Sequence, residues 1–274
     1  MSSYLSQFNY QINGPSEGRR WVFLHGLMGY AMNWRRIVTG LTSTEQVLTF
    51  DQRGHGKSWK PLTGYAAEDY ADDVYLITQE LGWDRFILVG HSMGGRNALE
   101  FAHRFPEKVE KLVIEDIGPE GDASAPDYYR WLFGLIPTPF VNKLRAKEFF
   151  MNEFKPLVKD RSENPDTLGQ YLYSNIVETP EGTADWRFSK DAMIATVIQG
   201  RAKDRWDVLR SLPMPTLVIR GERSKELSRE IYQQMLFSNP RVQGVEIPNA
   251  GHWVHSDQPE EFLQVIRKFT DLPS

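Results

Sequence analysis

The sequence predicts an α/β fold in which helices cover both faces of a mostly parallel sheet, with a helical segment inserted between two of the strands. Two observations lead to this prediction. Apolar runs of strand length alternate with segments of helical periodicity, and this order is typical of parallel sheets. The alternation then stops between residues 119 and 206 and resumes toward the C-terminus.

Six apolar runs have the length and composition of buried strands: 21–24, 47–50, 86–89, 112–114, 216–219 and 245–247. The helix between the second and third runs is indicated by apolar residues at steps of four, three and four: Tyr70, Val74, Ile77 and Leu81. We expect these side chains to pack against the sheet. The segment 4–12 is expected to add antiparallel strands at the sheet edge.

The segment 119–206 differs from the rest of the chain. It has no comparable series of strands, but it holds amphipathic, aromatic-containing stretches that prolines interrupt. We therefore predict a helical cap at 119–206, inserted into one α/β core formed by residues 1–118 and 207–274. A chain of 274 residues with 41% hydrophobic residues is large enough to bury such a core. The aromatic side chains of the cap are expected to serve mainly in packing.

Composition excludes several classes of function. A net charge of −4 provides no basic field for nucleic acid. The N-terminal region has no positive start followed by an apolar stretch, and nowhere do about eighteen apolar residues run together. The chain has no cysteine, which rules out disulfides, thiolate metal sites and cysteine nucleophiles. We expect neither export nor membrane insertion, and a cytoplasmic location agrees with the lack of cysteine.

The strongest candidate site is the pentapeptide Gly-His-Ser-Met-Gly at residues 90–94. It follows the strand-like run 86–89 and precedes the helix-like segment 97–102. The two glycines permit a sharp strand-to-helix turn that lifts the Ser92 hydroxyl to the end of the strand and leaves the Met93 N–H free for a developing oxyanion. A serine hydroxyl is a weak nucleophile on its own, so this interpretation requires a base elsewhere in the chain.

His252 is the candidate base. It lies on a loop between the strand-like segment 245–248 and a helical pattern near the C-terminus, whose apolar face is formed by Phe262, Val265, Ile266 and Phe269. Its imidazole can be neutral near pH 7 and accept the serine proton.

A second glycine-containing turn follows the first strong strand, at residues 25–29. This turn can direct the N–H of Leu27 toward the same point as the N–H of Met93. The two backbone donors would then stabilise a tetrahedral oxyanion. His25 is expected to hold the loop and to take no part in the chemistry.

The chain resembles the α/β-hydrolase family over essentially its whole length. Four motifs fall in the family's order and spacing: HGLMG at 25–29, DQRGHGKS at 51–58, GHSMG at 90–94 and GH at 251–252. The resemblance implies that the 51–58 loop shapes and supports the pocket wall. We expect no metal at Asp51 or His55.

The third member of the triad departs from the commonest pattern of this family. Many members place the carboxylate in a G-x-x-D arrangement after the strand here at 216–219, but this chain has Ser224 at that position. Serine cannot carry the charge that stabilises the histidinium. The other suitable position is the end of the run 112–116, where side chains alternate between faces, so that only one of Glu115 and Asp116 can serve. We choose Asp116, and two alternative acids remain: Glu222 and Glu226.

The relocated acid and three short runs, at 116–119, 220–224 and 251–255, resemble the YbfF-like bacterial esterases, a subgroup that includes mitochondrial relatives with an abhydrolase domain. In that subgroup the acid follows the strand after the nucleophile helix, and the enzymes cleave acyl esters or thioesters. The resemblance therefore implies a triad that consists of Ser92, His252 and Asp116.

Arg96 and Trp253 are candidate substrate-binding residues. Arg96 lies four residues after Ser92, where a cation could receive a carboxylate or phosphate of the substrate. A salt-bridged helix arginine with no such role is an equal alternative. The run 92–96 also resembles a menaquinone-pathway lyase, but that family has its acid at the position of Ser224. Trp253 follows His252 on the same loop.

The sequence as a whole predicts a serine hydrolase, a carboxylesterase or thioesterase, that needs no cofactor or metal and acts on a small-molecule acyl ester or thioester. One alternative is a lyase of the menaquinone type that uses the same serine. Another is a hydrolase-fold ligand receptor with slow turnover. Epoxide hydrolases and haloalkane dehalogenases are disfavoured, because their elbow residue is an aspartate.

Overall fold

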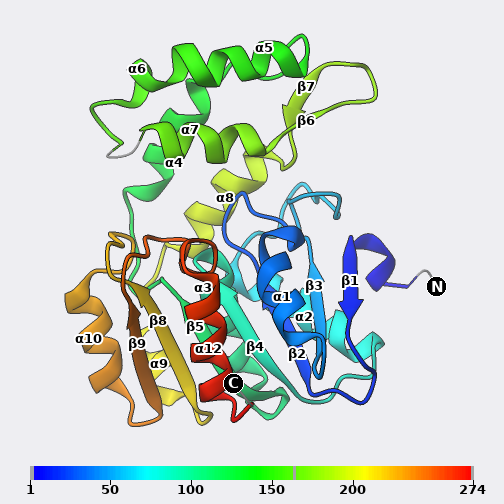
Figure 1. The fold of residues 1–274 in the computed structure, drawn as a ribbon, viewed down its shortest axis with the longest axis vertical. Coiled ribbons are helices and arrows are strands. Elements are labelled where there is room, and N and C mark those ends of the chain that lie inside the picture. The colour runs from blue at the N-terminus through cyan, green and yellow to red at the C-terminus, as the bar shows by residue number, and fades with distance from the viewer. Residues whose placement is uncertain (1–2, 163–164, 273–274) are drawn as a thin grey trace.

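The computed structural model describes residues 3–162 and 165–272 of the chain. In this part of the chain one large sheet forms the centre, with seven strands in the order β1-β3-β2-β4-β5-β8-β9 (Figure 1). Only β1 is antiparallel to its neighbour; the other neighbouring pairs are parallel. The strands are β1 (Tyr10–Asn13), β2 (Arg20–Leu24), β3 (Gln46–Phe50), β4 (Phe86–His91), β5 (Val109–Glu115), β8 (Thr216–Gly221) and β9 (Val242–Ile247).

Helices cover both faces of this sheet (Figure 1). They include α1 (Arg35–Leu41), α2 (Ala67–Glu80), α3 (Met93–Arg104), α9 (Trp206–Ser211), α10 (Arg229–Ser238), α11 (Val254–Asp257) and α12 (Pro259–Phe269). Alternate side chains of β4 enter different cores: Phe86 and Leu88 pack in the cluster with α2 and α3, whereas Ile87 and Val89 pack in the cluster with α1 and α12. The predicted α/β fold with a mostly parallel, doubly covered sheet is confirmed.

All six predicted strand runs lie within strands of the sheet. The expectation for the segment 4–12 is only half right. A single antiparallel strand, β1, pairs with β3, whereas residues Leu5–Gln7 form a 3₁₀ turn (η1). Two further 3₁₀ turns, η2 (Ala31–Trp34) and η3 (Pro106–Lys108), precede α1 and β5.

Between β5 and β8 the chain leaves the sheet and forms a separate layer beyond one end of it (Figure 1). We call residues 125–200, from the first to the last helix of this layer, the insertion. Its helices are α4 (Ala125–Gly134), α5 (Lys143–Glu148), the π-helical turn η4 (Phe149–Glu153), α6 (Phe154–Val158), α7 (Pro165–Ser174) and α8 (Lys190–Gly200). The insertion also contains a two-stranded hairpin, β6 (Ile176–Glu178) and β7 (Ala184–Trp186), which the sequence analysis did not anticipate.

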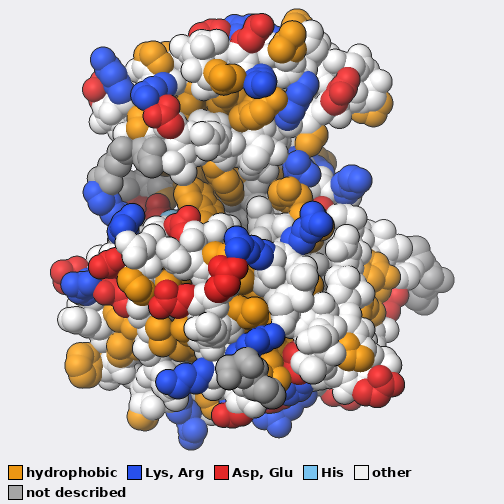
Figure 2. Space-filling model, in the orientation of Figure 1, with side chains coloured by type: hydrophobic (Ala, Val, Ile, Leu, Met, Phe, Trp, Pro, Cys, Tyr) orange, Lys and Arg blue, Asp and Glu red, His pale blue; other side chains and the backbone are white. Residues whose placement is uncertain are grey.

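The insertion has a core of its own, rich in aromatic side chains. Phe149, Phe154 and Trp186 belong to this cluster, which continues into Met28 and Met93 beside the predicted nucleophile. The insertion therefore packs directly on the loops that hold the candidate site. Figure 2 shows a hollow between the insertion and the sheet layer, with apolar side chains inside it. None of the described helices combines the length and apolar character needed to cross a membrane.

Candidate active site

Ser92 lies at the turn between β4 and α3. Its φ of 52° and ψ of −119° are a strained conformation for a residue with a side chain. Its N–H donates to the Glu115 carbonyl at 2.9 Å, which ties the turn to β5. A Cβ at Gly94 would collide with the Leu24 carbonyl oxygen, and one at Gly90 would collide with the carbonyl of Gly94. Both glycines of the pentapeptide are therefore required for the close approach of these chain segments.

Asp116 and His252 form a hydrogen-bonded pair. Asp116 follows β5 directly, and its Oδ2 accepts a hydrogen bond from His252 Nδ1 at 2.8 Å. The pairing of β4 with β5 sets His91 opposite Glu115, so that Ser92 and Asp116 come next on the two neighbouring strands. The carboxylate is fully buried and also accepts hydrogen bonds from the Gly221 N–H, at 3.0 Å to Oδ1, and from the Ser224 hydroxyl.

The partners of Asp116 affect the protonation of His252. Burial alone lowers the pKa of the imidazole, but the hydrogen bond and the negative charge of Asp116 outweigh it, and the pKa is raised above its ordinary value. With Nδ1 bonded to the carboxylate, Nε2 is the nitrogen left for proton transfer. Ser92 and His252 line the same cavity, of about 660 Å³, between the insertion and the sheet.

Each of the two alternative acids has a different partner. Glu222 accepts the N–H of Asn249 at 2.9 Å. Glu226 lines the cavity and pairs with Arg201 at 3.4 Å. The position beside His252 Nδ1 is taken by Asp116.

Leu27 and Met93 flank Ser92 in a second, smaller cavity. Met93 is the first residue of α3, where backbone N–H groups have no acceptor within the helix. The turn that holds Leu27 is fixed from several sides. His25 Nε2 accepts the N–H of Gln52 at 2.9 Å, and the Tyr171 hydroxyl of the insertion donates to the Leu27 carbonyl at 2.9 Å. His25 thus has the loop-holding position that the sequence suggested.

Arg96 is buried, and its guanidinium donates to four backbone carbonyls. These belong to the two connections between the sheet and the insertion: Gly118, Glu120, Gly200 and Lys203. Burial and the charges of Arg201 and Arg205 lower the pKa of Arg96 to about 10. The structure therefore favours a bracing role for this arginine, although its side chain also lines the small cavity.

Trp253 lies in the wall of the large cavity. Its ring centroid is 4.8 Å from that of Tyr171, so the loop that carries His252 contacts the insertion through these two rings. This position allows Trp253 to touch a bound molecule.

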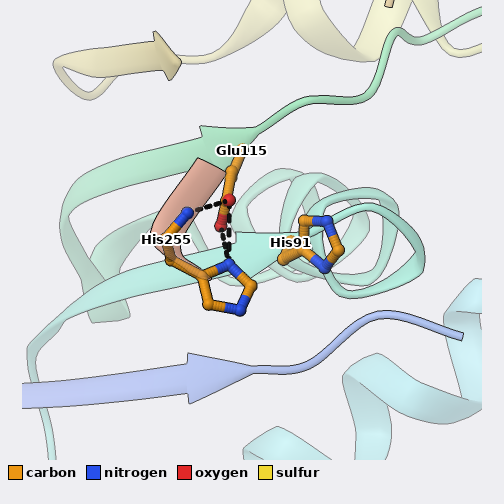
Figure 3. Close-up of side chains that lie close together, drawn as sticks. All are labelled: His91, Glu115 and His255. Atoms are coloured by element: carbon orange, nitrogen blue, oxygen red, sulfur yellow. Dashed lines mark hydrogen bonds and ion pairs between the residues drawn. The ribbon is translucent and has the colours of Figure 1, made fainter. Parts of the chain in front are cut away.

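Sequence reasoning missed a second histidine–carboxylate pair behind the first. Figure 3 shows Glu115, His255 and His91 side by side. Glu115 accepts hydrogen bonds from both Nδ1 and the backbone N–H of His255, at 2.8 and 2.9 Å. His91 Nε2 donates to the His252 carbonyl at 2.9 Å. The available signal was the alternation of side chains at 115 and 116 together with two histidines three residues apart.

These three side chains are also the group in the described part of the chain whose ligand atoms lie close enough to hold a metal. Both carboxylate oxygens of Glu115, however, already accept hydrogen bonds from His255 Nδ1. We therefore assign the group to structural support of the loop that carries His252.

Ser224 is the other residue whose role was missed. The sequence has this serine where related chains carry the acid, and a serine cannot hold the negative charge of that acid. Its hydroxyl instead donates to Asp116 Oδ2. Its position was the available signal, since a side chain there points to the same place as the usual acid.

Comparisons with known proteins show the family to which this chain belongs. The model of a family described as the alpha/beta hydrolase fold matches residues 22–259. The sn-1-specific diacylglycerol lipase ABHD11 of Mus musculus is 29% identical over 90% of this chain and 80% of its own length. Esterase YbfF of Escherichia coli (strain K12) is 26% identical over 90% of this chain and 91% of its own. A solved structure, the marine microorganism esterase, has a TM-score of 0.80 and 27% identity, covering 96% of this chain and 99% of its own. These relatives support a hydrolase of the esterase or lipase type.

Proposed function

Because the chain belongs to the alpha/beta hydrolase fold family, we propose that it is a carboxylesterase or thioesterase that works through an acyl-enzyme on Ser92. The observation that carries this proposal is the hydrogen bond between Asp116 and His252 at the wall of the cavity that Ser92 also lines. Two relatives, the mouse lipase and the Escherichia coli esterase, support the same class of reaction.

Acylation is the first half of the proposed reaction. Ser92 Oγ attacks the acyl carbonyl carbon, and His252 Nε2 takes the hydroxyl proton. The carbonyl oxygen becomes an oxyanion, which the N–H groups of Leu27 and Met93 stabilise. His252 then gives the proton to the leaving alcohol or thiol, and the acyl group stays on Ser92.

Deacylation repeats these steps with water. His252 removes a proton from a water molecule, which attacks the ester carbonyl on Ser92, and the proton returns to the serine oxygen as the acid leaves. Asp116 holds the imidazole in the tautomer with Nδ1 protonated and stabilises the positive charge that develops on it. No step requires a metal or cofactor.

We propose that residues 119–206 act as a cap over a core of residues 1–118 and 207–274, and that the substrate is a small-molecule ester or thioester held between them. The support is the lining of the large cavity. Tyr171 of the insertion faces it together with Trp253 and His252 of the core. The cap and the core then both determine which substrates fit the cavity.

The test is turnover by the parent and its Ser92→Ala variant on acetyl esters of p-nitrophenol and of coenzyme A. We expect many turnovers by the parent and none above background by the variant, together with fluorophosphonate labelling of the parent only. Equal labelling of the variant would refute Ser92 as the nucleophile. Turnover of the menaquinone-pathway substrate without ester hydrolysis would favour the lyase, and slow single turnover would favour a receptor.

A further inference from the structure

Two cavities of very different size meet at the predicted nucleophile. The large one holds about 660 Å³ and opens between the insertion and the sheet. The small one holds about 30 Å³ and lies on the other side of Ser92, toward α3 and α8. Three residues line both and mark the passage between them: Leu27, Ser92 and Tyr129.

The position of the base decides which part of the substrate enters which cavity. His252 lines the large cavity, whereas Met93, a proposed oxyanion donor, lines the small one. In the triad mechanism the histidine must protonate the leaving group, so the leaving group lies on the histidine side of the tetrahedral carbon. The acyl chain then extends to the opposite side.

We infer that the small cavity is an acyl pocket, and that the protein selects esters or thioesters of short acyl groups, acetyl to butyryl, carried on a bulky alcohol or thiol. This inference rests on the proposed function. A water molecule needs roughly 10–15 Å³ of such space. The 30 Å³ of the small cavity therefore has room for about two or three carbon atoms beyond the carbonyl.

The far wall of the small cavity is rigid, because hydrogen bonds fix the side chains that form it. Arg96 forms part of it and is held by its four backbone carbonyls. Thr196 is also fixed, because its hydroxyl is 2.7 Å from the Tyr70 hydroxyl and donates to the Ala192 carbonyl at 2.7 Å. A longer chain would have to break buried hydrogen bonds or leave the pocket.

Arg96 therefore gains a role in specificity as a fixed boundary of the acyl pocket. Its guanidinium limits the length of the chain through its position. This differs from the anion-binding role that the sequence suggested, in which the cation would pair with a charged substrate group.

The test is a series of acyl lengths measured with two leaving groups. kcat/KM is determined for acetyl, propionyl, butyryl, hexanoyl and octanoyl esters of p-nitrophenol, and for the corresponding coenzyme A thioesters. We expect a drop beyond butyryl of about 10- to 200-fold per misfitting step. The drop should fall at the same acyl length with both leaving groups, because the leaving group occupies the other cavity.

Val197 supplies the matched variants. Its buried side chain on α8 lines the small cavity, whereas that of its neighbour Ile198 is 38% exposed. Val197→Ala should raise the hexanoyl rate relative to the acetyl rate, and Val197→Leu should lower the butyryl rate relative to the acetyl rate. Ile198→Ala should keep the parental profile. Ratios within one variant are independent of how much protein folds.

Two results would overturn the inference. One is hydrolysis of octanoyl and butyryl esters at similar kcat/KM by the parent. The other is a length limit that shifts when p-nitrophenol is replaced by coenzyme A, since the acyl chain would then lie in the large cavity. Failure of the proposed function looks different: no ester of any length is hydrolysed in a Ser92-dependent manner.

Discussion

The two histidine–carboxylate pairs at the end of β5 are close neighbours with very different surroundings. Asp116 pairs with His252 and Glu115 pairs with His255, each with a shortest nitrogen-to-oxygen distance of 2.8 Å. The imidazole of His252 is 18% exposed and lines the large cavity. That of His255 is 3% exposed and lies against the ring of Trp34, with centroids 4.3 Å apart.

The difference shows that a short carboxylate–imidazole hydrogen bond does not by itself make a catalytic pair. Proton transfer also needs a nucleophile and substrate space at the second ring nitrogen. Asp116 and His252 meet this condition in the proposed mechanism. Glu115 instead binds the backbone N–H of His255 and so fixes the start of α11, just after the loop that carries His252.

The largest expected effect comes from Asp116→Asn. The substitution keeps the size of the side chain but favours the wrong imidazole tautomer, a change that costs about ten-thousand-fold in a serine protease triad. We expect kcat to fall by several orders of magnitude while circular dichroism shows an intact fold. Glu222→Gln and Glu226→Gln are the controls and should change kcat little. A larger loss of kcat in either control would show that the triad acid follows β8, which is the usual position in the family.

The pH dependence of activity should report the protonation of His252. Since Asp116 raises the pKa of His252 above its ordinary value, the neutral base predominates only above this raised pKa. kcat/KM should fall about tenfold per pH unit below it. The raised pKa stabilises the fold at low pH, and this contribution is lost as pH rises through the folded-state value.

NMR titration of the imidazoles measures this directly. In the Asp116→Asn variant the pKa of His252 should drop, because both its hydrogen bond to a carboxylate and the neighbouring charge are removed. An activity profile that follows a group unaffected by this variant would show that another residue is the base.

Glu115→Gln should affect stability more than chemistry. The amide keeps one acceptor but places a second donor against His255 Nδ1, and a buried unsatisfied donor costs about 1–3 kcal/mol in the free energy of unfolding. We expect a lower midpoint in denaturant unfolding and a far smaller loss of kcat than for Asp116→Asn. The comparison would fail if Glu115→Gln lost as much kcat as Asp116→Asn at unchanged stability.

Ser224→Ala should have the smallest effect. The variant removes one of the hydrogen bonds to Asp116 but leaves those from His252 and Gly221 in place. A hydrogen bond to a charged group contributes about 1.5–3 kcal/mol. If about half of this energy is lost in the transition state, kcat falls about tenfold. Steady-state kinetics of Ser224→Ala and of Ser224→Thr, which keeps the hydroxyl, measures this loss of kcat. A loss as large as that of Asp116→Asn would make the hydroxyl essential.

Much of the fold could be predicted because its signals are local. The run 86–89 is apolar on both faces, and the glycine-bounded turn of Ser92 follows it at once. The apolar run supports the prediction of the turn, and the turn supports the prediction of the strand. The alternation of side chains along β5 indicates only that one of Glu115 and Asp116 can serve, and it does not by itself select Asp116. The hairpin of β6 and β7 escaped because three-residue strands are too short to show a period.

The remaining features depend on contacts between distant segments. The carbonyl partners of Arg96 come from both ends of the insertion and carry no side-chain signal. The bond between Glu115 and His255 joins residues 140 positions apart. The small cavity beside Ser92 is lined from α2, α3 and α8, which lie far apart in the sequence, so that no single segment encodes it.

The most direct measurement of the central claim is the site of acylation. The parent is mixed with p-nitrophenyl butyrate, quenched in acid within the first turnovers, digested and mapped by mass spectrometry. We predict one butyryl group on the peptide that contains Ser92, slower to appear in Asp116→Asn and absent from Ser92→Ala. A butyryl group on another residue, or rapid turnover with Ser92 never acylated, would contradict the proposed mechanism.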